Sequence, residues 1–143
     1  MFKFQYTRKL VLWVDILGFR TFVQKSDKEP GLVKVLYEAI QKPSKLEADR
    51  FEYLDLGDLS VIDVEISGFS DTIVLSCEPT TKGLLYVFMY YLRLVEQLKT
   101  IGFFSRGALV VGDIFHENNT FFGPAVLRAV DLEKKAIYPR VII

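Results

Sequence analysis

The chain has 143 residues, half of them hydrophobic and 14% aromatic, which is enough for one domain with a sizeable core. Eighteen basic residues balance eighteen acidic ones, so no net positive charge favours nucleic acid or an anionic membrane as a partner. A single cysteine, Cys77, and a single histidine, His116, exclude an internal disulfide and leave few ligands for zinc. We therefore expect one domain over residues 1–143 in a cytoplasmic protein without a membrane span, and the apolar excess favours burial against a partner.

Hydrophobic patterns predict strands and helices that alternate along the chain. An apolar run at 9–16 predicts a central strand that ends before a turn at Gly18, and helices are expected at 18–25 and 32–40. Further on, the pattern predicts a strand at 61–66, a tight hairpin at 68–71, a strand at 72–77 and a helix from Thr80 or Thr81 to Thr100. The last part of the chain is expected to form a strand at 106–111, a polar turn at 113–119, a helix after Pro124 and a final strand at 141–143.

This order of elements favours an α+β fold with a mixed sheet of the ferredoxin-like or palm type and helices packed on one face. The chain ends inside the apolar run at 141–143, so we expect the natural protein to continue beyond Ile143.

Two aspartates have positions that suggest chemistry. Asp15 ends the first apolar strand, and Asp71 lies at the tip of the predicted hairpin. If that strand and the hairpin are neighbours, both carboxylates reach one edge of the sheet and can offset their repulsion by sharing a hard dication such as Mg²⁺. Backbone amides after Gly18 could hold phosphate, which would complete a two-metal arrangement for phosphoryl transfer. The spacing alone also fits the commoner roles of a turn aspartate and a strand-end cap.

Four segments, in order, resemble the catalytic domains of class III nucleotide cyclases, the adenylate and guanylate cyclases. The segments are Asp15-Ile16-Leu17-Gly18-Phe19, similar to the family's metal-binding start; Phe69-Ser70-Asp71-Thr72-Ile73-Val74, similar to the hairpin with its second metal aspartate; Arg106-Gly107-Ala108-Leu109-Val110-Val111-Gly112, similar to its next strand; and Phe122-Gly123-Pro124-Ala125-Val126 with Leu132-Glu133 and Ala136, similar to the following helix. The resemblance runs from about Val11 to Ala136.

The resemblance implies an enzyme that converts a nucleoside triphosphate to a 3′,5′-cyclic nucleotide by two-metal catalysis, with Mg²⁺ or Mn²⁺ as cofactor and a site formed in a homodimer. Asp15, Asp71 and the backbone carbonyl of Ile16 would be the metal ligands. The segment Gly18-Phe19-Arg20 would bind the nucleotide, and Arg20, where the family often has threonine, offers a cation for a triphosphate oxygen.

The sequence departs from the family at its transition-state donors and at its base-reading positions. The family's asparagine falls on Leu127 and its arginine on Asp131, and neither side chain can stabilise the charge that develops on phosphorus. The adjacent Arg128 is the candidate substitute, although a solvated helix cation is its simpler role. Ser67 and Thr120 occupy the base-reading positions. The chain therefore looks more like a divergent bacterial branch, such as the pyrimidine cyclases of antiviral (anti-phage) signalling, than like an adenylate cyclase.

Two alternatives stay open at this point. One is a cyclase-fold nucleotide-binding or regulatory module that has lost catalysis together with the asparagine and arginine. The other is a polymerase-palm relative that makes oligonucleotides, although Gly68-Phe69-Ser70-Asp71 lacks the Gly-Gly-Asp hairpin expected there. His116, beside Glu117 and two asparagines, is expected in a solvent-exposed turn, and Cys77 is expected to be a buried hydrophobic residue.

Overall fold

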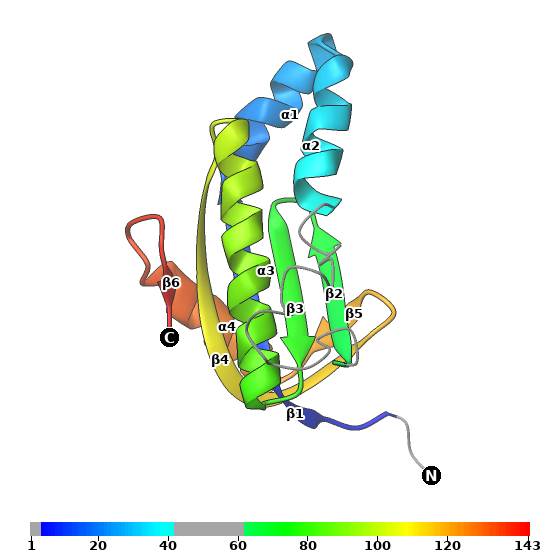
Figure 1. The fold of residues 1–143 in the computed structure, drawn as a ribbon, viewed down its shortest axis with the longest axis vertical. Coiled ribbons are helices and arrows are strands. Elements are labelled where there is room, and N and C mark those ends of the chain that lie inside the picture. Colours follow the sequence, from blue (N-terminus) through cyan, green and yellow to red (C-terminus); the bar gives the residue numbers. More distant parts are fainter. Residues whose placement is uncertain (1–3, 42–61) are drawn as a thin grey trace, which may run out of the picture.

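A computed structural model describes residues 4–41 and 62–143 of the chain. The elements, shown in Figure 1, are β1 (Thr7–Leu17), α1 (Phe19–Lys28), α2 (Gly31–Gln41), β2 (Val64–Phe69), β3 (Thr72–Cys77), α3 (Thr81–Thr100), β4 (Phe104–Glu117), β5 (Thr120–Phe122), α4 (Pro124–Lys134) and β6 (Val141–Ile142). The predicted order of strands and helices is confirmed, except that β5 was not predicted. No helix in the described parts has both the length and the apolar character that a membrane crossing requires.

The sheet has six strands and is mixed, as predicted. Its strands follow the order β2-β3-β1-β4-β5, all antiparallel, and β6 pairs with β4 in parallel. The apolar strand β1 is central, between β3 of the hairpin and β4. The expectation that the first strand and the hairpin are neighbours is therefore confirmed.

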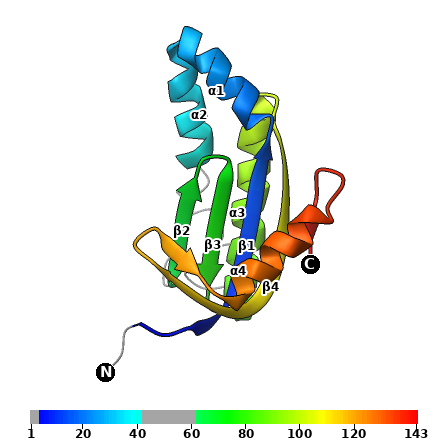
Figure 2. The same ribbon diagram turned by 180° about the vertical axis from the view of Figure 1, so that it is seen from behind.

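Helices cover both faces of this sheet, so the expectation that they pack on one face is wrong for α4. Alternate side chains of β1 point to opposite faces. The even positions, such as Leu12 and Val14, pack against α3 through Tyr90 and Leu94 in one core cluster. On the opposite face, Val11 belongs to a second cluster, to which α4 contributes Ala125, Val126 and Ala129. Figures 1 and 2 show α3 and α4 on opposite sides of the strands.

The strand β4 is longer than predicted and forms a hairpin with β5. The residues expected to make a polar turn at 113–117 continue the strand instead, because Ile114 alternates inward and is 1% exposed. The turn is confined to Asn118 and Asn119, which both have positive φ angles, as the favoured two-residue hairpins require. Figure 2 shows this hairpin lying across β2 and β3 on the face that carries α4.

Local signals in the sequence place the remaining element ends. The hydroxyl of Thr80 accepts a hydrogen bond of 3.1 Å from the backbone N–H of Gly83 and caps α3, as predicted. Pro124 lies in the first turn of α4. Gly18, with φ of 83°, provides the left-handed turn between β1 and α1. These caps fix where the chain turns at the two ends of the sheet.

Candidate functional site

Asp15 and Asp71 come together where β1 ends and the β2–β3 hairpin turns. Asp15 lies directly opposite Thr72, the residue that follows Asp71. The backbone N–H of Ile16 donates a hydrogen bond of 2.8 Å to the carbonyl of Asp71 and joins the two segments. Both aspartates are partly buried. The structure thus places the two predicted carboxylates and the Ile16 backbone at one corner of the sheet.

The environment of Asp15 favours its neutral form. The pKa of Asp15 is raised above its ordinary value, first by burial and then by the negative charges of Glu133 and Asp71 and a side-chain hydrogen bond with Glu133. A 3.0 Å hydrogen bond donated by the Thr72 hydroxyl opposes this shift. A bound cation would favour the ionised form instead. The groups at this corner that could bind a cation, the carboxylates of Asp15 and Asp71 and the backbone carbonyl of Ile16, all offer oxygen atoms, which suits a hard dication.

An ion pair between Arg106 and Glu133 lies beside Asp15, and neither residue is among those predicted for the site. Arg106 is the β4 residue directly opposite Asp15. Its Nε donates a hydrogen bond of 2.6 Å to Oε1 of Glu133 on α4. The sequence carries a signal for Glu133 alone, because Glu133 follows Ala125 and Ala129 at four-residue intervals and so falls on the buried stripe of α4.

Gly18, Phe19 and Arg20 form the start of α1, directly after the strand that carries Asp15. Arg20 is exposed and Phe19 is partly buried. An open depression of about 450 Å³ adjoins this turn and is lined by Leu17, Gly18, Thr21, Phe22, Lys25, Gly102, Phe103 and Phe104. The predicted phosphate-binding segment is therefore accessible, and Lys25 is a second cation close to it.

Ser67 and Thr120, at the two base-reading positions of the resemblance, have very different surroundings. Ser67 is 2% exposed, and its hydroxyl is 2.7 Å from Nε2 of His116. Thr120 is exposed at the start of β5, opposite Glu117. In the single chain, therefore, Thr120 faces solvent and the Ser67 hydroxyl is already engaged.

The expectation that His116 lies in a solvent-exposed turn is wrong. His116 is on β4 and partly buried, and its two ring nitrogens bond Ser67 of β2 and Ser76 of β3, the latter at 2.6 Å. Burial, and secondarily the charge of Lys9, lowers the pKa of His116 to about 4. The ring therefore fastens the β4–β5 hairpin to the sheet as a neutral group. The sequence could not show this, because the serines are 49 and 40 residues away.

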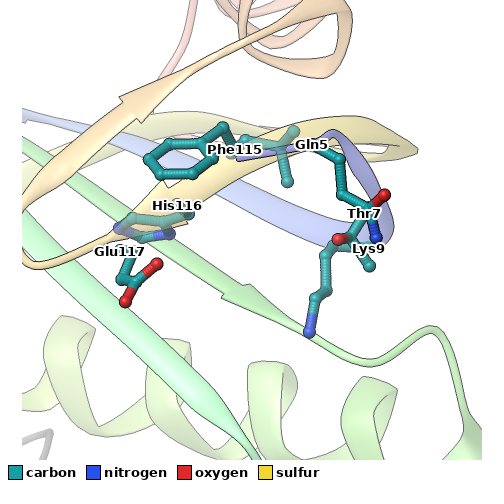
Figure 3. Close-up of a pocket in the computed structure, with 7 residues that line it drawn as sticks. Gln5, Thr7, Lys9, Phe115, His116 and Glu117 are labelled. Atoms are coloured by element: carbon teal, nitrogen blue, oxygen red, sulfur yellow. The ribbon is translucent and has the colours of Figure 1, made fainter. Parts of the chain in front are cut away.

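His116 also borders a small pocket of about 90 Å³ at the opposite end of β1 from Asp15. Figure 3 shows residues from the start of the chain and from the end of β4 around this pocket: Gln5, Thr7, Lys9, Phe115, His116 and Glu117. Lys9 precedes Asp15 by six residues on the same strand. None of the residues predicted for the metal or nucleotide site lines this pocket.

The helix α4 presents the residues that replace the family's transition-state donors. Leu127 is 69% exposed, and Asp131 is also exposed. Arg128 donates a hydrogen bond of 3.0 Å from Nη1 to the carbonyl of Val111 on β4. Arg128 is thus more than a solvated helix cation, because it ties α4 to the sheet.

Comparisons with solved structures find nucleotide cyclase domains. The guanylyl cyclase domain of the RhoGC fusion protein from the aquatic fungus Blastocladiella emersonii, described as monomeric, matches with a TM-score of 0.61 and 16% identity over 96% of this chain and 81% of that one. The guanylate cyclase domain of RhGC from Catenaria anguillulae, in complex with GTP, matches with a TM-score of 0.60 and 17% identity over 96% and 79% of the two chains.

A bacterial structure, the adenylate/guanylate cyclase/hydrolase from Silicibacter pomeroyi, matches with a TM-score of 0.52 and 16% identity over 91% of this chain and 71% of that one. No protein-family model and no curated protein matches the sequence. At these identities the likeness concerns the fold. The mixed α+β architecture expected from the order of elements is confirmed, and the chain has the fold of nucleotide cyclase catalytic domains.

Proposed function

We propose that this chain is a nucleotide cyclase domain that binds a nucleoside triphosphate with Mg²⁺ or Mn²⁺ and converts it to a 3′,5′-cyclic nucleotide. The observation that carries the proposal is the meeting of Asp15 and Asp71 at one corner of a sheet that has the cyclase-domain fold. Of the similar structures, the Catenaria anguillulae domain is described in complex with GTP.

The residues at this corner fit divalent cations. Asp15 accepts a hydrogen bond from a neutral hydroxyl and lies in the field of two other carboxylates, so a cation is the partner that would stabilise its ionised form. Asp15, Asp71 and the carbonyl of Ile16 would hold the ions. When bound, they would activate the ribose 3′-hydroxyl and offset the charge of the triphosphate.

The chain's own residues would bind and orient the triphosphate. The backbone N–H groups at the start of α1 are free to point toward an anion, because the first turn of a helix has no internal partners for them. Arg20 is exposed beside them and would contact a phosphate oxygen. The substrate would thus lie between the α1 turn and the two aspartates.

A second candidate, a nucleotide-binding or regulatory module without turnover, is favoured by α4. The exposed Leu127 has no hydrogen-bond donor to offer the transition state. The exposed Asp131 carries a negative charge, which would repel the negative charge that develops around the phosphorus. Arg128, the candidate catalytic residue, donates to the Val111 carbonyl and would have to leave it in order to reach a substrate. We therefore expect the chain to bind the triphosphate but to convert it slowly.

We further propose a homodimer, since α4 and β5 expose Leu127 and Phe122, which are 69% and 50% accessible. In a second structure, the guanylyl cyclase domain from Blastocladiella emersonii is described as a non-canonical dimer. We also propose that the protein is cytoplasmic, that it belongs to the pyrimidine-cyclase branch with a role in antiviral defence, and that Ser67 and Thr120 read the base.

Incubation of the purified protein with the four nucleoside triphosphates and Mn²⁺, followed by mass spectrometry, tests the function. We expect a cyclic nucleotide and pyrophosphate from the unaltered protein, and neither from Asp15→Asn or Asp71→Asn. Asp113→Asn is the matched control, because Asp113 is an exposed aspartate of β4. Mn²⁺-dependent triphosphate binding without product would identify the module. No binding at saturating Mn²⁺ would refute both proposals.

A further inference from the structure

Thr72 is the first residue of β3, and it lies directly opposite Asp15 in the antiparallel pair of β1 and β3. The next pair along the ladder, Ile16 and Asp71, is joined by a backbone hydrogen bond of 2.8 Å. In an antiparallel ladder such pairs alternate with pairs that share no backbone hydrogen bond, and in the latter the side chains approach each other more closely. The register therefore brings the side chain of Thr72 within reach of the Asp15 carboxyl.

The two side chains meet in one hydrogen bond. The Thr72 hydroxyl donates to Oδ1 of Asp15 at 3.0 Å, and both residues are partly buried. A hydroxyl can donate to a fully ionised carboxylate, so this bond requires no proton on Asp15. An ionised carboxylate has about four lone-pair sites on its two oxygens. One donated hydrogen bond therefore leaves Asp15 able to bind a cation.

Threonine is well suited to hold a carboxylate in one orientation. Its β-branched side chain rotates less freely about χ1 than an unbranched one and packs well in a strand. The backbone of Thr72 is fixed by its pairing with β1, and the bond from Ile16 to Asp71 fixes the adjacent turn. The hydroxyl is thus held in place before any ion binds, so little further entropy is lost.

We propose that Thr72 is a positioning residue for the metal site: its hydroxyl holds Oδ1 of Asp15 and so orients the carboxylate toward the cations. This inference rests on the proposed function. It gives the β2–β3 hairpin two parts in metal binding, because Asp71 is a ligand and the next residue orients the other ligand. Removal of a group that orients a metal ligand typically lowers metal affinity by about 10–100-fold.

The test is a titration of the full chain with Mn²⁺ alone, in which electron paramagnetic resonance measures the free ion. Thr72→Val removes the hydroxyl but keeps the β-branched shape, and it should weaken Mn²⁺ binding by about 10–100-fold. Thr72→Ser keeps the donor and should rescue the affinity to within about threefold of the unaltered protein, less than the loss expected without the donor. Thr7→Val is the matched control, since Thr7 is an exposed threonine at the other end of β1, and it should leave the affinity unchanged.

Thermal unfolding in a chelator measures separately what the hydroxyl contributes to the fold. A contribution to the sheet alone would lower the unfolding temperature of Thr72→Val without changing the Mn²⁺ affinity of the folded protein. Thr72→Ala also lacks the donor, so it should show the same loss of Mn²⁺ affinity, and it replaces Thr72→Val if that variant does not fold.

Two results would overturn the proposal and leave the proposed function intact. Unchanged Mn²⁺ affinity in folded Thr72→Val or Thr72→Ala would give the hydroxyl a purely structural role. Equal losses in Thr72→Ser and Thr72→Val would show that the shape of threonine matters and not its hydroxyl. Absence of Mn²⁺ binding to the unaltered protein would instead refute the proposed function itself and the inference with it.

Discussion

Acidification should loosen the β4–β5 hairpin through His116, which is the only histidine in the chain. In the folded chain the ring bonds Ser67 and Ser76, and its pKa is lowered from the ordinary 6.5 to about 4. Above pH 6.5 the ring is neutral whether the chain is folded or unfolded. Between pH 6.5 and 4 the unfolded chain takes up a proton and the folded chain does not. The free energy of unfolding therefore decreases as the pH falls through this range.

The pKa shift sets the size of the effect. At 1.36 kcal/mol per pH unit, the full shift corresponds to an upper bound of about 3 kcal/mol. His116 is only partly buried, so solvent screening reduces the expected loss to about 1–2 kcal/mol between pH 6.5 and pH 4. Asp15 acts in the opposite direction, because its raised pKa makes the folded chain take up its proton at a higher pH than the unfolded chain.

Urea unfolding at a series of pH values, without metal, measures this dependence. The comparison is with His116→Gln, which does not titrate but keeps a hydrogen-bonding side chain. Subtracting the two curves cancels the contribution of Asp15 and leaves that of His116. The unaltered protein should lose about 1–2 kcal/mol more than His116→Gln between pH 6.5 and pH 4. Parallel curves would contradict the role given to the buried ring.

Two further predictions concern the sheet and α4. Gly107→Ala should lower the free energy of unfolding by more than about 2 kcal/mol in urea titrations, because a Cβ there would lie 2.4 Å from the Trp13 carbonyl oxygen. The control is Gly31→Ala, which has open space around it and should change the free energy of unfolding little. Leu127→Asn combined with Asp131→Arg should raise turnover at least about 10²-fold in the mass-spectrometric assay, since each such donor typically changes the catalytic rate by about 10²–10³-fold. Unchanged turnover would show that these positions lie outside the transition-state site.

Much of the fold follows from local patterns in the sequence. The apolar run that ends at Asp15, the hairpin before Thr72 and the capped helix after Thr80 are all set by residues close together in the chain. Because β1 pairs with β3, these local elements bring Asp15 and Asp71 to one corner. The candidate metal ligands could be chosen from the sequence for that reason.

The surroundings of the site depend on contacts between distant residues. Arg106 and Glu133 are 27 positions apart, and no local pattern pairs them. The length of β4 depends on such contacts too, because His116 and its polar neighbours are typical of a turn when only the sequence is considered. The hydrogen bonds of His116 to two other strands outweigh that local preference.

A crystal structure of the protein with Mn²⁺ and a non-hydrolysable triphosphate tests the central claim most directly, because the anomalous signal of manganese locates the metal without assumption. The proposal predicts a peak within coordination distance, roughly 2.0–2.6 Å, of carboxylate oxygens of both Asp15 and Asp71, with the triphosphate against the turn at Gly18. Manganese and triphosphate bound elsewhere, for instance in the pocket beside Lys9 and His116, with none at the two aspartates, would contradict it.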